Sequence, residues 1–148
     1  MKENEFRRIV EEEWRNVPRP YKKHVKNVAL LIEDEPSETV RKEEGLEGED
    51  TLLGLYQGVP NTARGEGYGI GETLPDTVTV YRLPTLTEAE ALTAEFRKSD
   101  FEEQVRMVVR DTLWHELGHY FGYDDDRLHE REDEGTNTYP KEKNEEAD

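Results

Sequence analysis

Residues 115–125 read HELGHYFGYDD, and this stretch decides how the rest of the chain is interpreted. His115 and His119 are four positions apart, so on a helix they lie on one face, about one turn from each other. Two imidazoles in this arrangement can bind a single Zn²⁺ ion. Glu116 would then lie close enough to act as a general base toward a water molecule that the metal activates. The pattern therefore predicts metal-assisted hydrolysis of an amide bond.

The residues after His119 offer a third metal ligand. Gly122 can adopt positive φ, which lets the chain leave the helix sharply and turn back toward the metal. Asp125 lies six positions after His119 and completes a His-Glu-x-x-His-x-x-Gly-x-x-Asp pattern. Because the chain has no cysteine, only histidine, carboxylate and water remain as probable ligand types. The alternatives to Asp125 that stay open are Asp124, Asp126 and His129.

Two helices are predicted at and before this motif. The longer helix runs from about residue 100 to residue 121, carries apolar residues at helical spacing, and begins at a capping box of Ser99 with Glu102. A shorter helix precedes it and continues through Phe96. The two capping boxes considered for its start are Thr87 with Glu90 and Thr85 with Glu88.

Upstream of these helices the chain alternates between one more helix and three strands. Residues 4–17 carry apolar side chains at helical spacing and are followed by prolines, which predicts an amphipathic helix. Residues 28–32 form a short apolar run typical of a buried strand, and residues 51–57 predict a weaker second strand. Residues 77–81 alternate in β-branched and aromatic residues between two prolines, which predicts a third strand at the edge of the sheet.

The composition limits how much of the chain can form a core. Acidic residues number 36 and basic residues 20, giving a formal charge of −16, while 32% of the residues are hydrophobic. We expect an exposed loop over residues 33–50, a flexible connection or mobile flap over residues 58–71, a single domain over residues 1–130, and a disordered acidic tail over residues 131–148.

The same composition excludes several classes of protein. Binding to nucleic acid needs concentrated positive charge, which the sequence does not have, so we expect no nucleic-acid partner. No apolar run is long enough to span a bilayer, so no membrane partner is expected. The first residues lack the pattern of a secretory signal, which predicts a cytoplasmic protein.

The motif resembles that of the zincin metallopeptidases, especially those with aspartate as the third ligand. The whole arrangement is similar to a family of small bacterial zincin-like proteins with a minimal zincin fold, and the stretches that carry this resemblance are residues 33–36, 53–60, 74–76 and 115–128. The resemblance implies an α+β fold, in which a small sheet of about three strands packs against helices that include the long HExxH helix. It also implies one Zn²⁺ ion held by His115, His119 and Asp125, with Glu116 as the catalytic base.

Three functions compete at this point. The first is a zinc metallopeptidase that acts on a peptide or protein substrate. The second is a non-catalytic metal-binding or protein-interaction domain, and the third is an acidic decoy of nucleic acid. A structural zinc site is normally closed by four protein ligands and has no use for Glu116, which favours the first.

Two further roles are predicted around the motif. In larger zincins an edge strand aligns the substrate, and residues 77–81 are the expected counterpart. Tyr81, Tyr120 and Tyr123 are candidate oxyanion donors, although aromatic packing is the alternative use of each.

Overall fold

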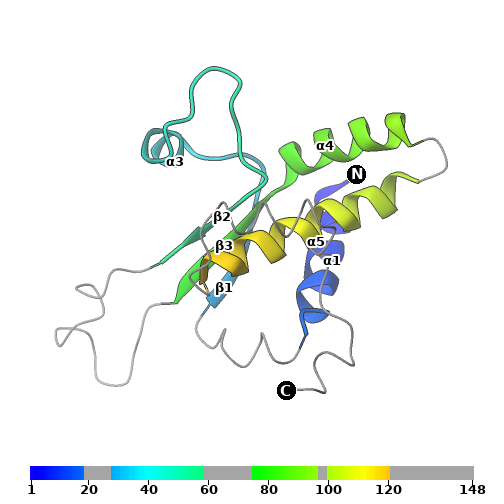
Figure 1. The fold of residues 1–148 in the computed structure, drawn as a ribbon, viewed down its shortest axis with the longest axis horizontal. Helices are drawn as coiled ribbons and strands as arrows, with labels where there is room; N and C mark the ends of the chain where they lie inside the picture. The colour runs from blue at the N-terminus through cyan, green and yellow to red at the C-terminus, as the bar shows by residue number, and fades with distance from the viewer. Residues whose placement is uncertain (19–27, 59–74, 97–99, 121–148) are drawn as a thin grey trace.

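A computed structural model describes residues 1–18, 28–58, 75–96 and 100–120 of the chain (Figure 1). These residues form a three-stranded mixed sheet and several helices, so the expected α+β class is confirmed. The elements in chain order are α1 (Glu3–Arg15), β1 (Val28–Glu33), α3 (Glu38–Glu43), β2 (Gly54–Gln57), β3 (Asp76–Tyr81), α4 (Arg82–Glu95) and α5 (Phe101–Tyr120).

The sheet has the strand order β1-β3-β2, with β3 parallel to β1 and antiparallel to β2. The prediction that residues 77–81 form an edge strand is therefore wrong, because β3 is the central strand. Pro75 precedes β3 and Pro84 lies in α4, so neither proline removes a hydrogen-bond donor from the paired residues. The β-branched run of β3 is instead explained by burial of most of its side chains, as in a covered central strand.

The core lies where α1 and α4 pack against α5 and where α4 and α5 contact β3. Helix α5 crosses β2 and β3, α4 runs beside α5, and α1 contacts α5 (Figure 1). Phe6, Ile9 and Val10 of α1 are fully buried, which confirms the amphipathic N-terminal helix. The buried core cluster consists of Phe6, Ile9, Val10, Val78, Val80, Leu86, Ala89, Val105, Val108, Val109 and Leu113.

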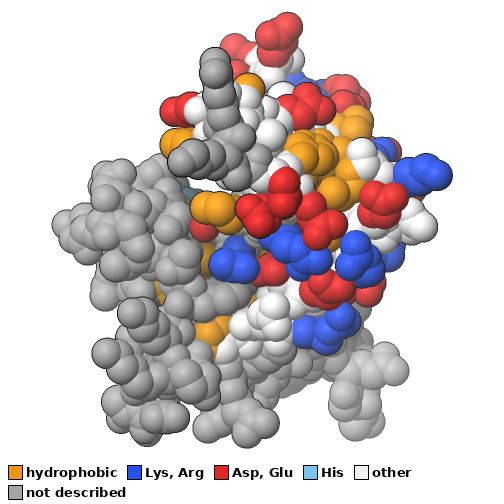
Figure 2. Space-filling model, turned by 90° about the vertical axis from the view of Figure 1, so that its right-hand side faces the viewer, with side chains coloured by type: hydrophobic (Ala, Val, Ile, Leu, Met, Phe, Trp, Pro, Cys, Tyr) orange, Lys and Arg blue, Asp and Glu red, His pale blue; other side chains and the backbone are white. Residues whose placement is uncertain are grey.

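An ion-pair network also joins α1 to α5. Glu13 of α1 is 2% exposed, and its carboxylate accepts a hydrogen bond from Nε of Arg110 at 2.9 Å. Arg106 lies 3.5 Å from the other oxygen of Glu13 and 2.8 Å from Glu12. Figure 2 shows acidic and basic side chains interleaved on one face of the molecule. Opposite charges on the two helices thus complement their apolar contact.

The starts of α4 and α5 differ from the predicted capping boxes. Helix α4 follows β3 directly and begins at Arg82. Pro84 is tolerated in its first turn, because the N–H that proline lacks is not needed there. Thr85 lies inside this helix and its hydroxyl donates to the carbonyl oxygen of Tyr81 at 2.7 Å. At the start of α5, the carboxylate of Asp100 accepts the N–H of Glu103 at 2.8 Å, which is the role of an N-cap. Ser99, the predicted cap, lies outside the described residues.

Residues 33–50 are largely exposed, as expected, but they are not only a loop. Ser37 caps the short helix α3 by accepting the N–H of Val40 at 3.2 Å. Arg41 then fixes the following turn by donating to the carbonyl oxygens of Gly48 and Asp50 at 3.0 and 2.7 Å. The acidic composition concealed a helix whose order comes from these polar contacts.

Two other predictions fall on parts of the chain that are not described. Most of the glycine-rich stretch 58–71 and all of the tail 131–148 lie outside the described residues. Within the described ranges, no helix is both long enough and apolar enough to cross a membrane.

Candidate active site

Helix α5 carries the first three candidate functional residues of the motif. His115 is half-buried and Glu116 is 8% exposed, and both lie on the part of α5 that faces β2 and a cavity. His119 is one turn further along α5, as its spacing requires, but its side chain lies outside what the structure describes. Within the described residues no group of three or more potential ligands is gathered. The remaining ligand candidates, Asp124, Asp125, Asp126 and His129, lie outside the described residues, together with His24, Gly122 and Tyr123.

Glu116 contacts the backbone of β2. Its carboxylate oxygen Oε1 accepts the N–H of Tyr56 at 2.7 Å. The N–H of Tyr81 donates to the carbonyl oxygen of Leu53 at 2.9 Å, and backbone polar groups alternate along a strand, so those of Tyr56 point away from β3. The predicted general base therefore lies at the outer side of β2, which in the described sheet is an edge strand.

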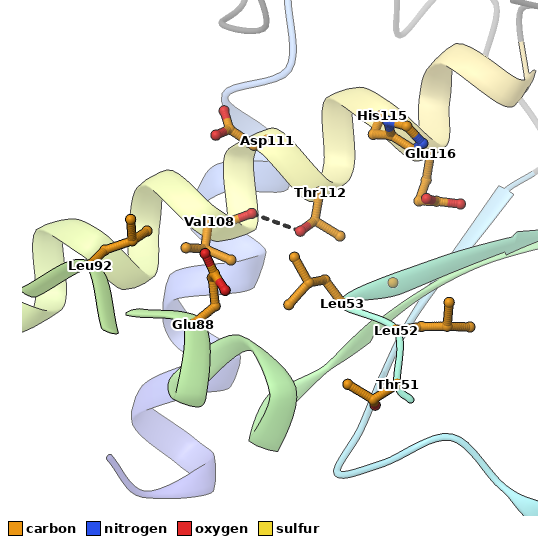
Figure 3. Close-up of a pocket in the computed structure, with 11 residues that line it drawn as sticks. Thr51, Leu52, Leu53, Glu88, Leu92, Val108, Asp111, Thr112, His115 and Glu116 are labelled. Atoms are coloured by element: carbon orange, nitrogen blue, oxygen red, sulfur yellow. Dashed lines mark hydrogen bonds between the residues drawn. The ribbon is translucent and has the colours of Figure 1, made fainter. Parts of the chain in front are cut away.

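Gly54 allows α5 to approach β2 this closely. A Cβ atom at this position would lie 2.5 Å from Cγ2 of Thr112 and 2.9 Å from the carbonyl oxygen of Thr79. The hydroxyl of Thr112 donates to the carbonyl oxygen of Val108 at 2.7 Å within α5 (Figure 3). This hydrogen bond fixes the threonine side chain with its methyl group against Gly54. The close approach in turn brings Glu116 within hydrogen-bonding distance of the strand.

A cavity of about 400 Å³ adjoins these residues, between α5, α4 and the segment that enters β2 (Figure 3). Its walls combine leucine and valine side chains with carboxylates, and His115 and Glu116 belong to the same lining. The residues that line it are Thr51, Leu52, Leu53, Gly54, Glu88, Leu92, Val108, Asp111, Thr112, His115 and Glu116. The cavity is thus continuous with the candidate catalytic residues.

Two tyrosines lie around the site. The hydroxyl of Tyr56 donates to the carboxylate of Asp76, which links β2 to the beginning of β3. Tyr81 is 1% exposed and packs in the interior, in accordance with the packing alternative. Burial, assisted by the negative charges of nearby glutamates including Glu116, raises the pKa of Tyr81 to about 12. Tyr120 ends α5, and its side chain is outside the described part of the chain.

Comparison with known proteins places this arrangement in a family. The sequence model of the zincin-like metallopeptidases matches residues 25–135, which include α5 and the whole motif. The chain belongs to the zincin-like metallopeptidase family. The match begins after α1, so this helix and its contacts with α5 lie outside the matched segment.

The solved structures include a similar chain, a conserved hypothetical protein from T. thermophilus. The two sequences are 25% identical, and the structures superpose with a TM-score of 0.47. The match covers 82% of this zincin-like chain and 94% of the T. thermophilus chain. A search of curated proteins gives no match.

The donor chemistry of the site fits the metal that the family implies. The imidazole of His115, the one proposed ligand whose side chain the structure describes, is a nitrogen donor that suits zinc and lines the cavity, and Glu116 beside it is held by a backbone N–H.

Sequence reasoning gave no role to Gly54, Tyr56 or Thr112. A glycine inside a predicted strand is a known signal of close backbone approach, and it could have identified Gly54.

Proposed function

We propose that this zincin-like protein is a zinc-dependent peptidase that hydrolyses peptide bonds in peptide or protein substrates. The observation that supports this most strongly is the position of Glu116. Its carboxylate accepts a backbone N–H from an edge strand while lining the same cavity as His115. This supports a role for Glu116 as proton acceptor beside the proposed metal position and next to a strand that can align a substrate backbone.

In this proposal His115, His119 and Asp125 would hold one Zn²⁺ ion. When bound, zinc would polarise the carbonyl of the scissile bond and lower the pKa of a coordinated water toward about 7. Glu116 takes the proton from the attacking water and delivers it to the leaving amine as the C–N bond breaks. The Tyr56 N–H engages one carboxylate oxygen at 2.7 Å, which holds the carboxylate of Glu116 in place beside the cavity.

Strand β2 replaces β3 as the proposed substrate-aligning strand. Both sides of β3 are paired, with β1 and with β2, so β3 has no edge to offer. Strand β2 is an outer strand of the described sheet and lies against α5. An extended peptide that runs along this strand would pass Glu116, which already accepts the Tyr56 N–H, and would reach the proposed metal position from the side of β2.

The test compares the wild-type protein with Glu116→Gln for zinc content and for cleavage of a peptide library. We expect equal zinc in both proteins and cleavage by the wild type alone, because the substitution keeps the shape of the side chain but removes the base. Zinc in both proteins with cleavage by neither would favour the non-catalytic metal-binding alternative. A lack of zinc in both would contradict the metal site itself.

The third ligand is tested separately. Asp125→Ala should weaken zinc binding by at least about tenfold, a typical consequence of losing a contributor to a metal site. Asp124→Ala and Asp126→Ala serve as matched controls, and equal effects of all three would refute the assignment of Asp125. The cytoplasmic location stays a prediction from the sequence.

A further inference from the structure

The cavity described above lies between α4, α5 and the segment that enters β2, and is called the cleft below. Its apolar walls and acidic groups are not used by the proposed peptidase function. We propose that this cleft selects substrates with a lysine or arginine side chain beside the scissile bond. This inference rests on the proposed function, since it concerns the same site. It is carried by the shape, the apolar walls and the charges of the cleft.

The apolar part of the cleft suits a long aliphatic stem. Leu53 lies at the entry to β2, Leu92 on α4 and Val108 on α5, and all three line the cavity of about 400 Å³ (Figure 3). Leu53 is 36% exposed, so part of this apolar surface faces the open cleft. Lysine and arginine cover such surfaces with their methylene groups while keeping their charge at a polar end.

The polar part of the cleft is acidic. Glu88 comes from α4, and Asp111 and Glu116 come from α5, whereas no lysine or arginine is among the lining residues that the structure describes. In Figure 3 the side chain of Glu88 extends from α4 toward Val108, across the space between the two helices. A cationic side chain that enters along the apolar wall would meet Glu88, whereas an acidic side chain would be repelled.

A second hollow continues this acidic surface. It has a volume of about 460 Å³ and shares Thr51, Leu53 and Glu88 with the first. Glu35 and Glu49 line its far side, again without a basic residue in the described lining. Glu88 therefore lines both hollows, and the charged residues in the described lining of each are acidic apart from His115. The net charge of −16 adds a long-range attraction for basic peptides.

The position of the cleft relates it to the scissile bond. Val108, Thr112 and His115 follow one another on one face of α5, so the pocket lies one to two turns before the first proposed ligand. A substrate whose scissile bond lies at His115 and Glu116 would place a neighbouring side chain in this pocket, because both residues belong to its lining. The selected residue is thus next to the bond that is cut.

Binding tests this inference independently of turnover. In a Glu116→Gln background, three peptides would differ at one position only, with lysine, norleucine or glutamate. Fluorescence anisotropy should show the lysine peptide binding more tightly than the norleucine peptide and the glutamate peptide binding most weakly. Adding Glu88→Gln should reduce the preference for lysine over norleucine by about fivefold, the upper range for an exposed charge pair. Adding Glu88→Lys should reverse the order of the charged peptides.

The matched control is Glu90→Gln, which removes the same charge from an exposed position of α4 that does not line the cleft. Equal effects of the substitutions at Glu88 and Glu90, or no preference for lysine, would overturn the inference. Cleavage of a peptide library by the wild type without enrichment of lysine or arginine would also overturn it and leave the peptidase proposal intact. Selective lysine binding without any cleavage would instead contradict the peptidase proposal and support the pocket.

Discussion

Gly54 shows how a single residue determines the geometry of the site. In most strands alanine is at least as favourable as glycine, because glycine loses more conformational entropy on folding. Here an added Cβ atom would lie 2.5 Å from the side chain of Thr112 and 2.9 Å from the backbone of Thr79, which reverses that preference. The methyl group would have to push α5 away from β2, and Glu116 moves with α5.

We therefore expect Gly54→Ala to lower the free energy of unfolding by about 1–3 kcal/mol, the usual cost of overpacking. Urea denaturation would measure the change. Gly58→Ala is the matched control, because a Cβ atom there would make only ordinary contacts at 3.7 Å and beyond. Equal stability of the two variants would contradict the proposed role of close packing at Gly54.

Tyr81 makes the free energy of unfolding depend on pH in the alkaline range. Its pKa is about 12 in the folded state and about 10 in an unfolded chain. Below pH 10 both states hold the proton, so the contribution of Tyr81 to stability is fully present. Between pH 10 and 12 the unfolded state loses the proton first, and stability falls as the pH rises.

Tyr81→Phe removes this dependence, so its stability should fall less steeply above pH 10 than that of the wild type. The unfolding free energy measured by urea at pH 9, 10 and 11 would test this expectation. Optical titration at about 295 nm should also show one tyrosine fewer among those that ionise late. Identical pH profiles would show that burial does not hold back the ionisation of Tyr81.

At the scale of elements, the contact of α1 with α5 contains an ion-pair network whose acidic and basic partners are buried to different extents. The side chain of Glu13 is 2% exposed, whereas those of Arg106 and Arg110 are 24% and 35% exposed. Loss of the two arginines leaves the buried carboxylate of Glu13 without a partner. Loss of Glu13 instead leaves two guanidinium groups that can reach water. The cost of breaking the network therefore depends on which side is removed.

We expect Arg106→Met with Arg110→Met to destabilise the protein by about 3–5 kcal/mol, the usual cost of leaving a buried charge without its partner. Glu13→Leu should cost clearly less, and the triple variant should recover most of the loss. Urea denaturation of the three variants would test this order. If Glu13→Leu cost as much as the double variant, the network would not be governed by burial of the carboxylate.

At the scale of the whole molecule, the main hydrophobic cluster lies ahead of the proposed metal site in α5, although the buried Trp114 and Leu117 flank His115 and Glu116. The buried cluster is built from α1, β3, α4 and the part of α5 up to Leu113, and it does not include His115. We therefore expect the fold to form without the metal. Zinc would instead stabilise the folded state through its binding free energy alone.

Removal of metal with a chelator should leave the far-ultraviolet circular dichroism nearly unchanged and lower Tm. Free zinc at 100 times its Kd should restore about 2.7 kcal/mol of stability. His115→Ala should show no such response, and magnesium should not replace zinc. Unfolding on chelation would show that the metal belongs to the structural core.

The sequence alone determined most of the local elements and the spacing of the motif residues. Apolar spacing is a property of neighbouring residues, so α1, β1 and α5 were predictable, and the spacing of His115, Glu116 and His119 follows from helical geometry. Prolines next to β3, in contrast, suggested an edge strand, because local sequence does not record which strands will pair.

Only the tertiary structure decided the strand order, the contact between Glu116 and Tyr56, and the cleft that includes Glu88. Glu116 and Tyr56 are 60 residues apart in the chain, and no local pattern encodes such a distance. These features arise because burying the shared core fixes how α4, α5 and β2 meet.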